Sequence, residues 1–300
     1  MADLYVKDYT DTKETPVARV LFIHGFGEHA NLYPEFFEFL NQRNIEVFCF
    51  DQRGFGRSKK SPKFQGCSGG WKQQLPDIDY HVQRASDTNL PLFLMGHSMG
   101  GGLSLRYGMI GDHRKNLKGV IAQAPMLQNH PDTKPGYLLY KSLSAVSRVM
   151  PNFTWNTKIM ETKKGTRDQK MMDRILSDPL ASSVGSLETL RDLINCSQQT
   201  LEEANQFHLP LLIAHGTDDN INLYEASQEF YEHASSRDKT FLSLPDCQHS
   251  PNIEQEPDRT LYLNQVCDWI HKHATLGNST PTPTTSAPNA TTASIVNPNA

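Results

Sequence analysis

A serine between two glycines, in the stretch GHSMG at positions 96 to 100, has the spacing of a nucleophile on a tight turn. The pattern G-x-S-x-G is typical of a sharp strand-to-helix turn that exposes the serine hydroxyl at the edge of a sheet. That hydroxyl is a weak nucleophile until a neighbouring base removes its proton. An apolar run precedes Ser98 and a helix-like segment follows it, so we predict that Ser98 attacks an acyl carbonyl. The alternative is a glycine-rich turn whose serine has no chemical role.

An acid and a histidine follow Ser98 in the order that α/β-hydrolases use for their catalytic side chains. Asp218 and Asp219 both come after the apolar run 209–216, and the usual distance from the glycine that ends the strand favours Asp219. Asp218 is then a turn residue or a helix cap. His249 lies in a loop before the last predicted helix, from which its imidazole can reach Ser98. We predict that His249 takes the serine proton and later gives it to the leaving alcohol.

Two backbone N–H groups are expected to stabilise the oxyanion that forms when the serine attacks. One belongs to Met99, directly after the nucleophile, and the other belongs to Phe26 in the stretch HGFGEH. Gly25 and Gly27 allow the loop around Phe26 to bend over the site. The alternative for this loop is a simple turn at the end of a strand.

The other histidines have ordinary structural explanations. His215 is expected to pack behind a strand, and His97 is expected to point away from the nucleophile. Five more are expected on polar helix faces: His81, His113, His233, His271 and His273. The chain has no Walker loop, no dinucleotide fingerprint followed by a ribose-binding acid and no HExxH, so we expect neither a cofactor nor a metal.

Short apolar runs alternate with helix-like segments along most of the chain. Such continuous runs are typical of strands buried on both faces, and the alternation indicates an α/β fold with a mostly parallel sheet flanked by helices. The strands are predicted at 18–25, 45–51, 90–96, 118–125, 209–216 and 239–246, with an extra edge strand at 4–10. The helices are predicted at 33–44, 101–116, 223–236 and 256–274.

The alternation stops between the two halves of this pattern, where no convincing strand is visible. We therefore predict a core in two parts, 1–125 and 209–274, with a helical cap or lid inserted at 126–208. Residues 275–300 are uncharged and rich in Thr, Pro, Asn, Ser and Ala. They carry too few apolar groups to offset the entropy of ordering, so we expect a disordered tail.

Composition excludes several classes of protein. A net charge of −4 and the absence of a large basic cluster argue against a nucleic-acid partner. The five cysteines form no CxxC pair, which favours reduced thiols in the cytosol. No secretory signal and no run of the ~18 apolar residues that a membrane span needs is visible. We expect a cytoplasmic protein that meets membranes only at their surface.

Six stretches together resemble the monoacylglycerol lipases, especially the fungal ones. They are HGFGEH, FDQRGFGRS, GHSMGGG, SDPL, HGTDDNIN and CQHS, and the likeness runs from about residue 17 to 273. The resemblance implies a serine hydrolase of the α/β-hydrolase superfamily, with Ser98, Asp219 and His249 as catalytic residues and Phe26 and Met99 as oxyanion donors. It also implies cleavage of long-chain monoacylglycerol to fatty acid and glycerol without a metal, by an enzyme that docks on membranes or lipid droplets through its cap.

The cap contains an apolar stripe beside two basic residues, in the stretch GYLLYKSLSAVSRVM at 136–150. Leu139 and Leu143 on this stripe are predicted to bind the acyl chain, and Lys141 and Arg148 flank it as basic residues do on lipid-binding helices. Residues around 136–176 would then form a lid, although the stripe could instead pack on the sheet domain. A lysophospholipase, a broad carboxylesterase or an acyltransferase is the alternative enzyme. A non-catalytic binding protein is disfavoured by the intact Ser, Asp and His set.

Overall fold

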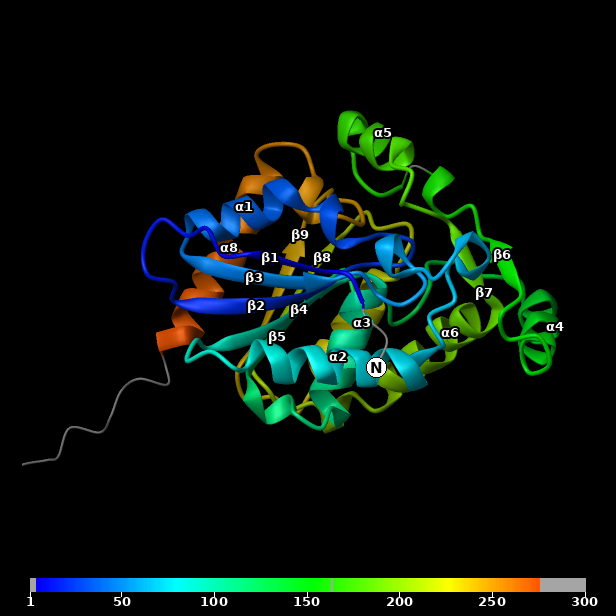
Figure 1. Ribbon diagram of the computed structural model, residues 1–300, viewed down its shortest axis with the longest axis horizontal. Helices are drawn as coiled ribbons and strands as arrows, with labels where there is room; N and C mark the ends of the chain where they lie inside the picture. The colour runs from blue at the N-terminus through cyan, green and yellow to red at the C-terminus, as the bar shows by residue number, and fades with distance from the viewer. Residues whose placement is uncertain (1–3, 163, 276–300) are drawn as a thin grey trace, which may run out of the picture.

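A seven-stranded, mostly parallel sheet forms the centre of the molecule (Figure 1). The computed structural model describes residues 4–162 and 164–275. In spatial order, the strands are β1 (Val6–Tyr9), β3 (Ile45–Phe50), β2 (Ala18–Ile23), β4 (Leu92–His97), β5 (Leu117–Gln123), β8 (Leu211–Gly216) and β9 (Lys239–Leu244). β1 pairs antiparallel with β3, and the other pairs in this sheet are parallel.

The apolar runs of the sequence explain this arrangement. Every residue of β4 and of β8 is buried, as expected for central strands covered on both faces. β1 has half-buried residues at its two ends and exposes Lys7 and Asp8 between them, which suits an edge strand. The predicted strands and the predicted edge strand are therefore confirmed, with ends that differ by at most two residues.

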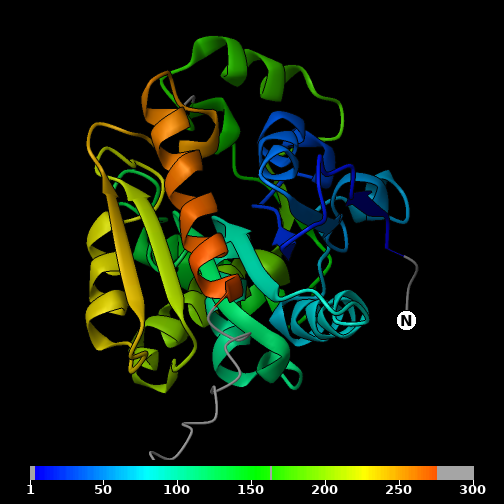
Figure 2. The ribbon, with the colours of Figure 1, turned by 90° about the vertical axis from the view of Figure 1, so that its left-hand side faces the viewer.

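Helices cover both faces of the sheet and divide the core into two clusters (Figure 2). On one face lie α1 (Pro34–Gln42) and α8 (Asp258–Thr275), the helix in front of the strands in Figure 2. On the other face lie α2 (Trp71–Ala85), α3 (Met99–Ile110), α6 (Leu187–Glu202) and α7 (Tyr224–His233). Short 3-10 helices lie at Ala30–Leu32, Gly56–Ser58, Pro62–Phe64, Arg114–Asn116, Met160–Thr162, Ala204–Gln206 and Pro251–Ile253.

The segment between β5 and β8, residues 126–208, is called the cap below. It contains α4 (Tyr137–Ser147), α5 (Gln169–Ser177) and α6, together with an antiparallel pair of strands, β6 (Thr154–Asn156) and β7 (Val184–Ser186). The expectation that this segment holds no strand is wrong. Each of these strands has only three residues, and its partner lies far along the chain, so neither gives a local alternation to recognise.

Two helices also differ from the sequence prediction. α2 was not predicted, because Gly69, Gly70 and Pro76 interrupt the pattern and the helix carries many polar side chains. The helix expected at 101–116 begins at Met99 and ends at Ile110, and a separate 3-10 turn follows at Arg114–Asn116. Except for Thr275 at the end of α8, the tail predicted at 275–300 lies outside the described residues.

Two histidines that were expected on polar helix faces are buried instead. His81 stacks on Phe50 with ring centroids 4.0 Å apart, and burial lowers the pKa of His81 to about 4. His273 stacks on Trp269 with centroids 3.9 Å apart, and its Nε2 lies 2.9 Å from Asp238 Oδ2. Both rings serve as flat apolar surfaces that retain a polar edge.

Candidate active site

Ser98 stands on the turn between β4 and α3 in a strained backbone conformation. Its φ of 53° and ψ of −117° lie where residues other than glycine are rarely found. Neighbouring backbone holds it there: Ser98 N–H donates to the Gln123 carbonyl at 2.9 Å, and Met126 N–H donates to the Ser98 carbonyl at 2.9 Å. The predicted strand-turn-helix context of the serine is therefore confirmed.

The glycines beside Ser98 are needed because backbone passes so close to them. A Cβ on Gly96 would lie 2.1 Å from the Gly100 carbonyl oxygen. A Cβ on Gly100 would lie 2.1 Å from the Ile23 carbonyl oxygen, on the strand that leads to the loop around Phe26. The turn, the start of α3 and the end of β2 can approach one another only with glycine at both positions.

Asp219 and His249, which lie far apart along the chain, meet at the carboxyl ends of β8 and β9. His249 Nδ1 lies 2.7 Å from Asp219 Oδ2, and both side chains are buried. Asp219 Oδ1 accepts N–H groups from Ile221 at 2.8 Å and Asn222 at 3.0 Å. Burial alone would raise the pKa of the Asp219 carboxyl, but His249 and His215 beside it hold that pKa well below its usual range. Asp218 is exposed and takes no part in this contact.

Ser98 and His249 line one cavity of about 440 Å³. Among the described residues, no hydrogen bond joins the Ser98 hydroxyl to the His249 ring. Contacts of this kind often tighten only when a substrate is bound. The structure thus brings the nucleophile and base candidates to one cavity wall, with Asp219 behind the base.

Phe26 and Met99, the two candidate oxyanion donors, line the same cavity. Met99 is the first residue of α3, so its N–H has no acceptor within the helix. In the described part of the chain, neither the Phe26 N–H nor the Met99 N–H donates to a protein acceptor. Unpaired N–H groups at a helix start suit a developing negative charge on a substrate.

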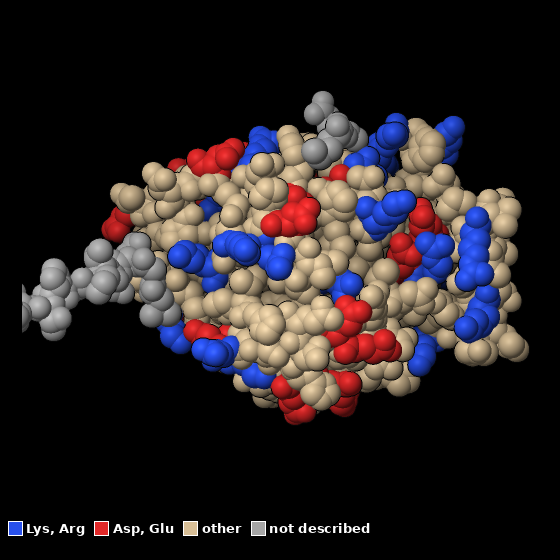
Figure 3. Space-filling view, turned by 90° about the horizontal axis from the view of Figure 1, so that it is seen from below, with Lys and Arg blue, Asp and Glu red and all other residues tan. Residues whose placement is uncertain are grey.

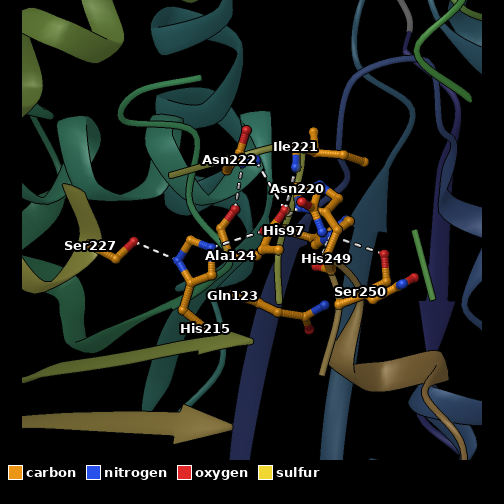
Figure 4. A network of polar contacts seen from close by, with 12 residues as sticks. His97, Gln123, Ala124, His215, Asn220, Ile221, Asn222, Ser227, His249 and Ser250 are labelled. Atoms are coloured by element: carbon orange, nitrogen blue, oxygen red, sulfur yellow. Dashed lines mark hydrogen bonds and ion pairs between the residues drawn. The ribbon is translucent and has the colours of Figure 1, made fainter. Parts of the chain in front are cut away.

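A second histidine, His215, also contacts the acid, and sequence reasoning missed this contact. His215 Nε2 lies 2.9 Å from Asp219 Oδ2. On the other side of the ring, His215 Nδ1 lies 2.7 Å from Ser227 Oγ, and Figure 4 shows His215 and Ser227 side by side. The prediction that His215 packs in the interior is correct but incomplete. A signal was present, because His215 is the penultimate residue of a buried strand and lies four residues before Asp219.

A second ion pair, between buried His97 and half-buried Glu28, joins the loop that carries Phe26 to the end of β4. His97 Nδ1 lies 3.2 Å from Glu28 Oε2, and the same carboxylate accepts the Tyr33 hydroxyl and the Gly25 N–H. Burial opposes ionisation of both partners, yet their attraction lowers the pKa of Glu28 to about 2 and raises the pKa of His97. His97 Nε2 lies 3.3 Å from the His249 carbonyl oxygen, so the ring contacts the backbone of the base rather than the nucleophile.

Mostly apolar side chains from α4, α5 and α6 complete the cavity. Leu139 and Leu143, the residues predicted to bind an acyl chain, both line it. Met172 from α5 and Leu190 and Ile194 from α6 line it as well. The cap therefore forms one side of the cavity, and the loops that carry Ser98 and His249 form the other.

The described residues contain no group of three or more His, Cys, Asp or Glu side chains arranged to hold a metal ion. The five cysteines are free thiols. Within the described chain, no helix is both long and apolar enough to cross a membrane.

The chain is similar in sequence to a known family and to several known proteins. Residues 14–256 match the family described as Hydrolase_4: Serine aminopeptidase, S33. A putative monoglyceride lipase of Schizosaccharomyces pombe is 56% identical over 97% of this chain and 80% of its own length. A monoglyceride lipase of Saccharomyces cerevisiae is 29% identical over 86% of this chain and 85% of its own.

One solved structure extends the comparison to the fold. A soluble variant of monoglyceride lipase from Saccharomyces cerevisiae, in complex with a substrate analogue, superposes with a TM-score of 0.82 at 27% identity. The match covers 89% of this chain and 91% of that one. The predicted α/β-hydrolase fold is confirmed.

Proposed function

The chain belongs to the Hydrolase_4 family (serine aminopeptidase, S33), and from that premise we propose that it cleaves monoacylglycerol to fatty acid and glycerol through an acyl-serine intermediate. The monoglyceride lipases to which it is similar support the reaction and the substrate class. The observation that carries the proposal is one apolar cavity that holds both Ser98 and His249, with Asp219 against the imidazole.

The first half of the reaction forms the acyl-enzyme. His249 takes the proton of Ser98 as the hydroxyl oxygen attacks the ester carbonyl carbon, and the ionised Asp219 stabilises the imidazolium that results. The Phe26 and Met99 N–H groups stabilise the negative charge on the former carbonyl oxygen. The tetrahedral intermediate then collapses, the bond to the glycerol oxygen breaks, and His249 gives its proton to that oxygen.

The second half of the reaction returns the enzyme to its starting state. A water molecule attacks the acyl carbon while His249 accepts a proton from it. Collapse of the second tetrahedral intermediate releases the fatty acid, and the proton passes from His249 back to the Ser98 oxygen. The acyl chain lies against Leu139 and Leu143 in the cavity throughout, so residues around 136–176 act as a lid over it.

The outer face of α4 is suited to lipid surfaces. Tyr137 is 71% exposed, Leu138 79% and Val149, which follows the end of the helix, 83%. These three residues are called the outer face of α4 below, and their large apolar side chains face solvent. Lys141 and Arg148 are exposed beside it, and Figure 3 shows Lys and Arg side chains at the end of the molecule where the cap lies. An apolar face flanked by cations favours peripheral attachment to a membrane or a lipid droplet, which would present the substrate to the cavity.

A fluorophosphonate probe tests the proposed function, with the wild type beside Ser98→Ala. We expect the wild type to be labelled and to hydrolyse monoacylglycerol, and Ser98→Ala to lose labelling and at least about 10⁴-fold in kcat. An unlabelled wild type would refute the enzyme assignment. If the enzyme preferred lysophosphatidylcholine to monoacylglycerol, the proposed substrate would be wrong but the proposed acyl-serine mechanism would stand.

A further inference from the structure

The helix α5 of the cap lies between two loops of the proposed catalytic site. The segment before it, residues 165–168, contacts the loop that carries His249. The segment after it, residues 178–182, contacts the loop that carries Phe26. These two contacts are made by backbone and charged side chains, not by the apolar surfaces that line the cavity.

Backbone contacts join the segment before α5 directly to the neighbours of His249. Ser250 N–H donates to the Gly165 carbonyl at 2.8 Å. The Thr166 hydroxyl donates to the Ile253 carbonyl at 2.9 Å, and Thr166 is buried. A displacement of this segment would therefore also displace the residue that follows His249.

An ion pair between half-buried Arg167 and buried Glu254 strengthens the same contact. Arg167 Nε donates to Glu254 Oε2 at 2.9 Å, and the guanidinium also donates to Asp258. The Glu254 side chain is fully buried, and its Oε1 accepts the Gln248 N–H at 2.8 Å. Glu254 thus connects Arg167 of the cap to the residue that precedes His249. Removing one partner of such a pair leaves an uncompensated buried charge, which strongly destabilises the surrounding structure.

The segment after α5 contacts the other loop. Ser182 N–H donates to the Gly27 carbonyl at 2.8 Å, and His29 Nε2 lies 3.2 Å from Asp178 Oδ1. Gly27 has a φ of +75°, and a Cβ there would lie 1.9 Å from the Ser182 carbonyl oxygen. The cap therefore rests on the residue next to Phe26 with no room for a side chain between them.

We infer that residues 165–182 fix the position of the His249 loop relative to the Phe26 loop. Arg167 is then a positioning residue, which acts on His249 through Glu254. The inference rests on the proposed function, because it assigns His249 the role of base. Binding of a lipid surface or an acyl chain to the cap would then act on the geometry of the base and not only on access to the cavity.

Arg174 provides a matched control on the same helix. Arg174 Nη2 donates to Glu35 Oε2 at 3.0 Å, so it also joins α5 to the core. Glu35 lies on α1 and the pair is largely exposed. Among the described residues, no hydrogen bond or ion pair joins Arg174 to the His249 loop or the Phe26 loop, although its side chain lines a small pocket beside both of them. Loss of this pair loosens α5 without removing a partner of the His249 loop.

The test compares Arg167→Met with Arg174→Met on a short, water-soluble ester that does not need the acyl part of the cavity. We expect Arg167→Met to lower kcat by about 30-fold with KM changed less than about twofold, since small displacements of catalytic groups cost up to about 100-fold. Arg174→Met should keep kcat within about twofold. Arg167→Lys should recover part of the loss, because it restores the charge but not the paired geometry.

A spectroscopic readout separates positioning from general loosening of the cap. The proton between His249 Nδ1 and Asp219 should give a downfield NMR signal, identified by its absence in His249→Ala. We expect this signal to broaden or vanish in Arg167→Met and to persist in Arg174→Met. If Arg167→Met does not fold, Arg167→Lys against Arg174→Lys carries the same comparison.

Three results would overturn the inference. They are an unchanged kcat in Arg167→Met, an equal loss in both arginine variants, and a change confined to KM for long-chain substrates. A wild type that neither hydrolyses the short ester nor reacts with a fluorophosphonate would instead refute the proposed function and, with it, the site that Arg167 serves.

Discussion

The loops that hold Ser98, Asp219 and His249 differ from the outer face of α4 in the surroundings of their side chains. In the loops, charged side chains have several hydrogen-bond partners within the protein, whereas on α4 apolar side chains are exposed to solvent. Below the cavity, each carboxylate oxygen of Asp219 has two partners, and Glu28 is held by His97, Tyr33 and the Gly25 N–H. On α4, large apolar side chains face solvent, and no element of the described part of the chain covers them. The first region is built to keep a fixed geometry, and the second is built to meet something outside the chain.

This difference predicts that substitutions below the cavity act on the chemical step, whereas substitutions on α4 act on delivery of the substrate. Each of the following substitutions tests whether the two regions have these separate roles. They are given in order, from the largest expected effect to the smallest.

Asp219→Asn should have the largest effect of these four. The amide cannot stabilise the imidazolium of His249 and favours the wrong tautomer, so kcat should fall by about 10⁴-fold. Asp218→Asn is the matched control, because Asp218 is adjacent but exposed, and its kcat should change less than about twofold. Steady-state hydrolysis of monoacylglycerol measures both variants. If kcat fell further in Asp218→Asn than in Asp219→Asn, Asp218 and not Asp219 would be the catalytic acid.

His215→Phe should have a smaller effect on the same step. It removes one of two imidazole partners from Asp219 Oδ2 and leaves Ser227 without its ring partner. Loss of a buried hydrogen bond to a charged group predicts a fall in kcat of about tenfold, with KM little changed. Ser227→Ala keeps the contact between His215 and Asp219, so its kcat should fall by less than about threefold. An effect on KM alone would place His215 outside the catalytic step.

Leu138→Ser combined with Val149→Ser tests the outer face of α4. Neither side chain lines the cavity, so hydrolysis of a short soluble ester should stay close to the wild-type rate. Co-sedimentation with phospholipid vesicles should fall by about fivefold, because less apolar surface enters the lipid. If vesicle binding is unchanged while the soluble rate falls, the two regions are not separate in function.

Glu28→Gln should give the smallest effect, a change in how stability depends on pH. The pKa of Glu28 is lowered from 4.5 to about 2, so the ionised carboxylate stabilises the fold above about pH 4.5 and loses that contribution as the pH falls towards 2. The pKa of His97 is raised, so its charged form contributes below its ordinary value of 6.5 and is lost as the pH rises through the raised value. The Tm difference between wild type and variant should therefore be largest between these limits. A difference that is constant from pH 3 to pH 8 would contradict the ion pair.

The residues of the proposed chemistry could be predicted because their signals are local. Ser98 sits in a five-residue pattern, and Asp219 and His249 each follow a buried strand in a fixed order. Parallel strands bring such positions to one edge of the sheet whatever lies between them. The sheet was predictable for the same reason, since each strand is a continuous apolar run.

The supporting contacts could not be predicted because their partners are far apart and chemically ordinary. Arg167 and Glu254 are 87 residues apart, and nothing near either one indicates a buried pair. Glu28 and His97 lie within recognised motifs but meet only after β2 and β4 pair. The short strands β6 and β7 depend on the path of the cap and not on their own composition.

The positive φ of Ser98 has a consequence for how this chain can change over time. A residue held in that region costs about 1–3 kcal/mol, which surrounding contacts must offset. Ser98→Gly would relieve the strain and remove the nucleophile in one substitution, so we expect a protein that is inactive yet no less stable. Selection for folding stability alone would favour glycine at position 98, and only selection for catalytic activity keeps the serine. At this one position, the residue that makes the turn reactive also makes it less stable.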